Sequence, residues 1–408
     1  MKPLNEIKVV MLGDYVASNT AGRWFAGIGC DVVKVESLKG DPWRKYGTLM
    51  TAPKAYDEYE NPVFDTYNAN MRCISLDLKN ESGRAVFDKL LGEADIFITN
   101  NRQASLERNG LDYESIKDKY PTLIYGQLTG YGTVGPDINN PGFDTVAYYA
   151  RSGIMGDLSM KGDAPITSMP CGGDDMIGVM LWGAVLAALV NRETSGKGQR
   201  VDLSIFGAAV WNASCVLATS QPKYGYPYPK ARTDQNPLGM SYKTGDGEWI
   251  MLSLLDWARY AAPLCEALKM DHNLIDDERF CDQPTLRKHK EEFVAILDEE
   301  FAKWNAEEIS ARMLERDLPH TILGHFCNLT KDPQALLNNY VIEYPVGKDG
   351  NDKTWIATMP VHFGGMEVPE FRRGPLLGED TVAVMTELGY GQSEIDAALA
   401  AGYVQQHE

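Results

Sequence analysis

The first forty residues alternate apolar runs with a turn and a helical stretch. Apolar residues dominate Lys8–Leu12 and again Asp31–Glu36, and both runs have the length of a β-strand. Between them lie the turn Gly13–Asn19 and the stretch Thr20–Gly29, which we expect to be helical. A strand, a turn, a helix and a second strand in so short a span predict a parallel sheet with crossover helices.

The same alternation continues through the first half of the chain. Val201–Leu203 is a further short strand, and an apolar stretch, Phe206–Thr219, follows it and is expected to be one helix. We therefore predict an α/β fold in which residues 1–220 form the first part of a large, doubly wound domain of Rossmann type. Its other expected elements are the strands Cys73–Leu78, Asp95–Thr99 and Leu123–Leu128 and the helix Ser82–Glu93.

The composition changes after residue 220. Gln221–Pro229 holds three Pro and three Tyr, so it cannot continue a helix and is expected to be a linker. A hairpin over Ser241–Leu255 then opens a smaller α+β domain, which we place at residues 221–330. A second hairpin, Tyr344–Ile356, lies in a C-terminal segment at 331–408, which ends in a helix, Thr381–Leu388, and a short tail.

The chain is strongly acidic, but its charge is unevenly spread. Its 408 residues carry 39 Lys and Arg against 57 Asp and Glu, a net charge of −18. Nucleic-acid binding needs a basic surface, so the balance argues against it. Residues 1–110 are nearly neutral, with 14 basic and 15 acidic side chains, whereas residues 221–408 hold 18 and 31. An anionic ligand is therefore expected on the first part of the chain.

The seven cysteines form no CxxC pair and do not cluster with histidine, which excludes the usual zinc and iron–sulfur patterns. Their odd number argues against a disulfide framework, so we expect buried, reduced thiols in a cytoplasmic protein. Met1–Ile7 lacks the apolar stretch of a signal peptide. The longest apolar run, Met176–Val190, is too short to cross a bilayer and predicts a buried core helix, so we expect no membrane partner.

Familiar catalytic motifs are missing from the sequence. The first turn, Gly13–Ser18, has one glycine where a dinucleotide fingerprint needs three, which argues against NAD. The six histidines have no metal-ligand spacing, and neither G-x-S-x-G nor a P-loop occurs. The first turn nevertheless lies at the carboxyl edge of the predicted sheet, where ligands of open α/β folds bind and free N–H groups suit anions.

A second candidate is the stretch Cys171–Asp175, which directly precedes the long apolar run. Gly172 and Gly173 would let a ligand approach the backbone closely. An aspartate here has two interpretations. It is a helix cap kept ionised by the helix dipole, or it is a carboxylate nucleophile beside glycine N–H groups that hold an oxyanion.

A series of collinear motifs resembles the class III CoA-transferases, the family of formyl-CoA and carnitine CoA-transferases. The resemblance covers nearly the whole chain. The motifs that carry it are Gly29–Glu36, Gly40–Arg44, Asn68–Lys79, Ala94–Asn100, Gly130–Pro136, Gly173–Asp174, Gly196–Gln199 and Leu376–Glu379.

This resemblance implies that Asp174 is the nucleophile. It would attack an acyl-CoA carbonyl and form a mixed anhydride, and the released CoA thiolate would convert this into an aspartyl-CoA thioester. An acceptor carboxylate would then take over the CoA. The implied partners are acyl-CoA and a small carboxylic acid as substrates, with no permanently bound cofactor and no metal.

The resemblance also assigns residues to the two substrates. Many family members stack a basic residue on adenine where this chain has Ser37, so the adenine contact is expected from Lys39 or from another side chain. The expected CoA-binding residues are Val16, Ala17, Lys39, Arg72, Asn100 and Arg108. The expected acyl-site residues are Phe143, Asp144, Gly172 and Gly173.

Family members form interlocked homodimers, in which the C-terminal segment returns to the large domain. The stretches Pro141–Asp144 and Gln235–Lys243 are most similar to the branch that acts on 2-hydroxy acids such as phenyllactate and 2-hydroxyisocaproate in amino-acid fermentation. An (R)-2-hydroxy acid is thus the expected acceptor. Carnitine-like or dicarboxylic acids, an acyl-CoA racemase or epimerase, and a non-enzymatic CoA-binding protein remain alternatives.

Overall fold

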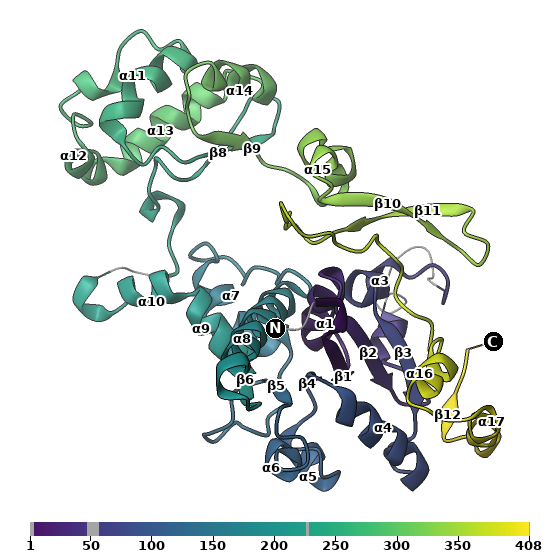
Figure 1. Ribbon diagram of the computed structural model, residues 1–408. Helices are drawn as coiled ribbons and strands as arrows, with labels where there is room; N and C mark the ends of the chain where they lie inside the picture. Colours follow the sequence, from purple (N-terminus) through teal and green to yellow (C-terminus); the bar gives the residue numbers. More distant parts are fainter. Residues whose placement is uncertain (1–3, 47–56, 226–227, 408) are drawn as a thin grey trace. The chain divides into compact units, whose positions relative to one another are not determined.

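The computed structural model describes residues 4–46, 57–225 and 228–407. The chain divides into two units (Figure 1). The first comprises Met1–Ile154, Thr167–Ala218 and Thr330–Glu408, and the second comprises Met155–Ile166 and Thr219–Leu329. The segment Met155–Ile166, which the sequence interpretation placed in the large domain, thus belongs to the second unit.

A seven-stranded sheet forms the centre of the first unit, in the order β12-β3-β2-β1-β4-β5-β6. The pairs from β3 to β6 are all parallel, and only β12 pairs antiparallel, with β3. The order 3-2-1-4-5-6 is that of doubly wound sheets, so the expected α/β fold with a large parallel sheet is confirmed. The strands are β1 Lys8–Leu12, β2 Asp31–Glu36, β3 Arg72–Leu76, β4 Ile96–Thr99, β5 Ile124–Thr129, β6 Arg200–Ser204 and β12 Val404–Gln405.

Helices cover both faces of this sheet, which explains why its strands are apolar throughout. Val9 and Met11 of β1 belong to one core, whereas Val10 between them belongs to the other. The first core packs against α1 (Ala17–Gly27), α8 (Gly172–Ser195) and α9 (Ile205–Asn212). The second packs against α4 (Glu81–Glu93), α5 (Gln103–Arg108), α6 (Tyr113–Ile116), α16 (Thr381–Glu387) and α17 (Gln392–Ala401).

Helix α8 is longer than the expected run, with 24 residues. By length and apolar composition alone it could cross a membrane. However, Ile177, Leu181 and Val185 along one side are fully buried in the first core, beside α1. This side packs as the sequence predicted for a core helix, whereas Met176 and Val190, at the two ends of the predicted run, are exposed.

The second unit has its own core around a three-stranded antiparallel sheet of β7 (Ser241–Lys243), β8 (Trp249–Leu252) and β9 (His320–Ile322). The pairing of β7 with β8 confirms the hairpin expected there. The helices of this unit are α11 Trp257–Leu268, α12 Gln283–Lys288, α13 Lys290–Phe301 and α14 Ala306–Leu314. Other helices of the chain are α3 Pro62–Asn68, α7 Ile154–Asp157, α10 Ser214–Thr219 and α15 Pro333–Leu337.

Three local expectations are wrong. The predicted helix Phe206–Thr219 is two helices, α9 and α10. The predicted tail after residue 388 is ordered into α17 and β12, because Val404 is buried where β12 extends the sheet beside β3. The cysteines are not all buried, since three of the seven, Cys215, Cys281 and Cys327, are exposed. The hairpin expected near Tyr344 is present as β10 (Val341–Val346) and β11 (Asp352–Ala357).

Candidate active site

The first turn of the sheet, between β1 and α1, is held by a side chain from the end of β4. Asn100 accepts a hydrogen bond from the Asp14 N–H at 3.1 Å and donates one to the Asp14 carbonyl oxygen at 2.7 Å. A β-carbon at position 13 would lie 2.6 Å from Ser18 Oγ and 2.7 Å from Asn100 Oδ1, so only glycine fits there. The backbone on both sides of Asp14 is therefore fixed.

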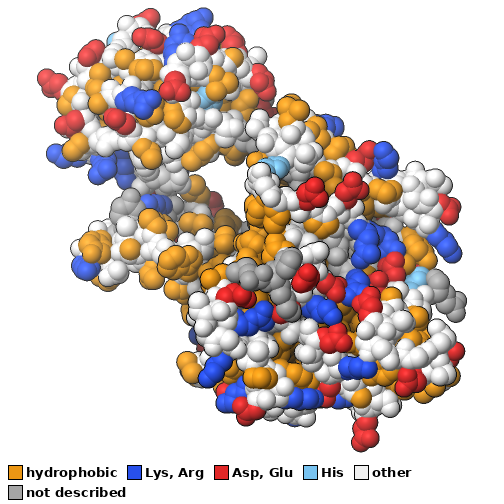
Figure 2. All heavy atoms as spheres, in the orientation of Figure 1, with side chains coloured by type: hydrophobic (Ala, Val, Ile, Leu, Met, Phe, Trp, Pro, Cys, Tyr) orange, Lys and Arg blue, Asp and Glu red, His pale blue; other side chains and the backbone are white. Residues whose placement is uncertain are grey.

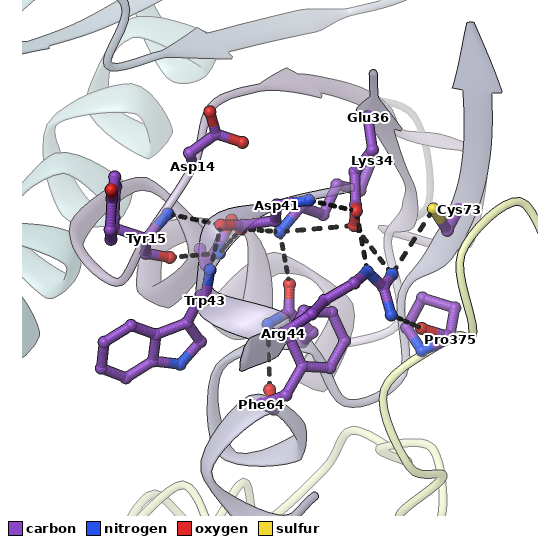
Figure 3. A network of polar contacts seen from close by, with 12 residues as sticks. Asp14, Tyr15, Lys34, Glu36, Asp41, Trp43, Arg44, Phe64, Cys73 and Pro375 are labelled. Carbon is purple, nitrogen blue, oxygen red and sulfur yellow. Dashed lines mark hydrogen bonds and ion pairs between the residues drawn. The ribbon is translucent and has the colours of Figure 1, made fainter. Parts of the chain in front are cut away.

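Tyr15, the next residue, has φ of 64°, which is unusual for a residue with a side chain. Its N–H donates to Asp41 Oδ1 at 3.1 Å, and its carbonyl oxygen accepts from Asn19 Nδ2 (Figure 3). Asn19 Nδ2 also donates to Asp41 Oδ2 at 3.0 Å. Asp41 thus compensates for the strained backbone of the turn by binding it directly and through Asn19.

Asp41 itself belongs to a buried ionic network. Lys34, with no exposed side-chain surface, donates to Asp41 Oδ2 at 2.5 Å and to Asn68 Oδ1 at 2.9 Å. Glu36 lies 3.7 Å from the Lys34 ammonium and binds Arg44 through two hydrogen bonds of 2.8 Å. Burial alone would raise the pKa of Glu36, but Lys34 and Arg44 outweigh burial and lower it to about 2. Two of the motifs noted in the sequence, Gly29–Glu36 and Gly40–Arg44, therefore supply the support for the first turn.

Tight packing fixes the start of α8. Cys171 is the N-cap residue and has φ of 63°. A β-carbon at position 172 would lie 2.3 Å from Met169 Cε, and one at position 173 would lie 2.7 Å from Tyr148 Cγ and 3.0 Å from Asp144 Cβ. The glycine at 173 is thus required by the close approach of η3, a π-helical segment at Asp144–Ala150, while the glycine at 172 leaves room for the side chain of Met169. Asp174 consequently lies within the first turn of α8 and is not its cap.

Three carboxyl groups crowd this helix start. Burial raises the pKa of Asp174 to about 8, and repulsion from Asp144 and Asp175 adds to the effect. Burial also raises the pKa of Asp144, which is 7% exposed, although the N–H groups of Thr145, Gly173 and Cys171 oppose this. The sequence interpretation expected the helix dipole to keep Asp174 ionised, whereas burial and the two neighbouring carboxylates raise its pKa.

The two adjacent aspartates of α8 differ in their partners. Thr20 Oγ1 donates to Asp175 Oδ1 at 3.4 Å, and Tyr67 also binds this carboxylate. Burial raises the pKa of Asp175 to about 6, and these two hydrogen bonds oppose the rise. Among the described residues no hydrogen bond reaches the Asp174 carboxylate, which lines a cavity instead.

This cavity of about 500 Å³ lies at the carboxyl ends of β1, β4 and β5, within the first unit. The ring of Phe143 meets the ring of Tyr15 edge to face, with centroids 5.4 Å apart. Arg102 reaches the cavity from the N-cap position of α5. The residues used below that line it are Asp14, Tyr15, Ala17, Asn100, Arg102, Phe143 and Asp174.

The structure brings together part of the predicted site. Ala17, Asn100, Phe143 and Asp174 line the cavity. Val16 is buried beside Trp43 and Phe64 in a small apolar cluster under the turn. As described above, Asp144, Gly172 and Gly173 surround the base of Asp174.

Three predicted CoA-binding cations do not line this cavity. Lys39 and Arg108 are exposed elsewhere on the surface of the first unit. Arg72 opens β3 at the opposite edge of the sheet, where it pairs with Asp31 at 2.7 Å and with Glu387 at 2.8 Å. The cavity also holds Asp14 and Arg102, which the sequence interpretation assigned to neither substrate. Arg102 was noted there only as one of several basic residues near the ends of strands, and both residues follow the carboxyl ends of strands.

The site places a partly buried carboxylate beside a glycine pair at the edge of an open α/β sheet. This arrangement is typical of enzymes that use a carboxylate as a covalent nucleophile. Comparison with known proteins agrees with the sequence resemblance. The model of the CoA-transferase family III matches residues 4–381. The chain therefore belongs to this family, and it is a CoA-transferase that uses CoA thioesters as substrates.

Two relatives and one solved structure illustrate the similarity. The (R)-2-hydroxy-4-methylpentanoate CoA-transferase of Clostridioides difficile is 34% identical, over 96% of this chain and 97% of the relative. The cinnamoyl-CoA:phenyllactate CoA-transferase of Clostridium sporogenes is also 34% identical, over 96% of this chain and 94% of the relative. The crystal structure of a CAIB/BAIF family protein from Brucella suis superposes with a TM-score of 0.79 at 26% identity, covering 95% and 99% of the two chains.

Proposed function

We propose that this enzyme transfers CoA from an acyl-CoA donor to an (R)-2-hydroxy acid through covalent intermediates on Asp174. The observation that carries the proposal is the position of Asp174. Its carboxylate lines the cavity at the sheet edge without a hydrogen-bond partner among the described residues, whereas Asp175 beside it is bound by Thr20 and Tyr67. A desolvated carboxylate without partners is the more reactive nucleophile.

The proposed reaction has four steps in which atoms and charges balance. The Asp174 carboxylate attacks the donor's thioester carbonyl and expels CoA thiolate, which leaves an acyl-aspartyl anhydride. The thiolate attacks the aspartyl carbonyl of this anhydride, giving an aspartyl-CoA thioester and the free donor acid. The acceptor carboxylate attacks the thioester and again expels thiolate. The thiolate finally attacks the acyl carbonyl of the new anhydride, which forms the new acyl-CoA and restores Asp174.

The CoA moiety is proposed to enter along the ends of β1 and β4. Ala17 and Asn100 line the cavity there, and Asn100 holds the turn in place. Arg102 is exposed, and no carboxylate pairs with it among the described residues, so it is free to attract a phosphate. Arg72 is held by two carboxylates, so Arg102 takes the role that the sequence assigned to Arg72.

The acceptor class is supported by the two relatives, whose names place (R)-2-hydroxy-4-methylpentanoate and phenyllactate as their substrates. Both compounds carry a hydroxyl group on the carbon next to the carboxylate. Their common identity of 34% along nearly the full length of the chain favours this class over carnitine-like or dicarboxylic acids.

We also propose that two copies of the chain assemble as an interlocked homodimer. Figure 2 shows hydrophobic side chains gathered over α9 and α10. Trp211 of α9 is 71% exposed, and Met176 and Val190 of α8 are exposed as well. Large exposed apolar side chains of this kind mark interaction surfaces. Light scattering during size-exclusion chromatography should give twice the chain mass, and a monomer at micromolar concentration would contradict the assembly.

The nucleophile is tested by trapping. Wild-type enzyme incubated with acyl-CoA and hydroxylamine should acquire a hydroxamate at position 174, located by mass spectrometry of peptides. Asp174→Asn should show neither label nor CoA transfer while keeping its fold. Asp163→Asn, which changes an exposed aspartate, is the matched control and should behave as wild type. A label at another residue, or transfer by Asp174→Asn, would refute the assignment.

A further inference from the structure

Asp14 is a second acid in the cavity of Asp174, and the reaction proposed above gives it no role. Its backbone is fixed on both sides by Asn100, and its side chain lines the cavity. Figure 3 shows the Asp14 carboxylate directed away from the ionic network of Lys34 and Asp41. Among the described residues no hydrogen bond reaches this carboxylate.

The charge of the Asp14 carboxylate is unfavourable in these surroundings as long as no hydrogen-bond donor binds it. Burial raises the pKa of Asp14 to about 6, repulsion from Asp41 adds to this, and attraction to Lys34 opposes it. Lys34 cannot neutralise it fully, because its ammonium binds Asp41 and Asn68. At neutral pH Asp14 is therefore mainly ionised, and a half-buried carboxylate gains most from a donor that arrives with a ligand.

Both substrates bring donors into the cavity, because the pantetheine arm of CoA carries amide N–H and hydroxyl groups, so the test below distinguishes a CoA contact from a contact with the acid. The acceptor's carboxylate is itself an anion and has no proton to donate. A 2-hydroxy acid has one donor next to the reacting carboxylate, its 2-hydroxyl group. The carboxylate that attacks at Asp174 thus carries this hydroxyl one carbon away, inside the cavity that Asp14 lines.

We propose that Asp14 is a specificity-determining residue whose carboxylate accepts a hydrogen bond from the 2-hydroxyl group of the acid substrate. This inference rests on the proposed function and deepens it. It assigns the recognition of the hydroxyl group to a residue on the first turn, which the supporting network of Asp41 and Asn100 holds rigidly. The negative charge of Asp14 also disfavours acids that would place a second carboxylate there.

The test compares one acid with and without its hydroxyl group. Wild type, Asp14→Ala and Asp14→Asn are assayed with (R)-2-hydroxy-4-methylpentanoate and with 4-methylpentanoate, using one acyl-CoA donor, and kcat/KM is measured from the CoA esters formed. Asp14→Ala should lower the ratio of the two kcat/KM values about tenfold or more. Asp14→Asn keeps an acceptor oxygen and should fall between Ala and wild type. The KM of the acyl-CoA donor should not change.

Both variants should fold, since removing an unpartnered carboxylate leaves no group unsatisfied, and thermal unfolding checks this. Asp163→Asn, which changes an exposed aspartate outside the cavity, is the control and should keep the wild-type ratio. A ratio that Asp14→Ala leaves unchanged, or an equal loss with both acids, would overturn the inference, because equal losses point to a contact with CoA. A wild-type enzyme with no preference for the hydroxy acid would overturn the proposed substrate class as well.

Discussion

The ionisation of Asp174 should control the rate of the enzyme at neutral pH. Burial and the neighbouring carboxyl groups place its pKa at about 8, whereas only the carboxylate form can attack a thioester. At pH 7 about one tenth of the free enzyme would carry the carboxylate, and at pH 9 about nine tenths would. Because kcat/KM reports ionisations of the free enzyme, it should rise about tenfold from pH 7 to pH 9.

The assay is CoA transfer under subsaturating acyl-CoA, followed by chromatography of the CoA esters, with spontaneous thioester hydrolysis subtracted at each pH. The carboxylic acid substrate is ionised across this range, so it adds no titration of its own. Asp175→Asn removes one of the two neighbouring charges and should move the rise to lower pH. Asp163→Asn should leave it in place. A flat profile between pH 6 and pH 9 in an enzyme that Asp174→Asn inactivates would refute the reasoning.

The raised pKa of Asp174 also predicts how the free energy of unfolding depends on pH. A carboxyl group whose pKa is higher in the folded state than its ordinary value of 3.8 holds its proton more tightly when folded. The folded state then binds more protons than the unfolded state, so stability falls as pH rises from about 4 to 8. Asp174→Asn cannot ionise and should have a higher Tm than wild type at pH 8, while the difference disappears near pH 4.

Three further changes test the site and its support. Arg102→Ala should raise the KM for acyl-CoA severalfold and weaken the dependence of that KM on salt, measured by initial rates at several ionic strengths. Gly173→Ala should abolish transfer or lower Tm, because the added carbon would lie 2.7 Å from Tyr148 Cγ, whereas Gly183→Ala on the same helix meets nothing within 4 Å and should be tolerated. Lys34→Ala should destabilise the enzyme by about 3–5 kcal/mol in urea unfolding, because it leaves the buried carboxylate of Asp41 unpaired.

The fold was most predictable where local pattern and burial agree. Strands β1 and β2 have the residues that the sequence predicts, because both of their faces are buried, and only Lys8, at the start of β1, is exposed. The end of the chain was missed. Its helix α17 is short and rich in alanine, and β12 has only two residues, so its existence depends on the exposed edge of β3 that it covers. The sequence around residue 404 contains no information on where the edge of β3 lies, so the pairing could not be predicted locally.

The candidate site was predictable in its position but not in its electrostatics. The resemblance located Asp174, but its raised pKa depends on Asp144, which lies thirty residues earlier in the chain and meets it through the packing of η3 on α8. Arg72 and Arg102 show the same limit. Arg72 is the first residue of β3, whereas Arg102 follows β4, and only the latter position reaches the carboxyl edge. The direction of the strand was the missing part of that argument.

The near neutrality of residues 1–110 does not by itself create a site for an anion, because several of their basic side chains are already paired. Lys34, Arg44 and Arg72 are among its basic residues, and all three are already paired with carboxylates of the same chain. Their charges therefore contribute little attraction for the phosphates of CoA. Exposed cations such as Arg102 must therefore attract the phosphates near the cavity. The net charge of −18 repels CoA at long range, and these cations oppose that repulsion only near the site.

The contrast between Asp174 and Asp175 gives a physical reason for which of two adjacent acids is the nucleophile. Hydrogen bonds from Thr20 and Tyr67 stabilise the charge of Asp175, which lowers both its basicity and its tendency to donate electrons. Asp174 has lost water without gaining such partners, so its charge is destabilised in the free enzyme. That energy is recovered when the carboxylate becomes an uncharged anhydride or thioester, because neither derivative needs solvation by donors. The partial burial of Asp174 therefore favours the covalent intermediates over the free carboxylate.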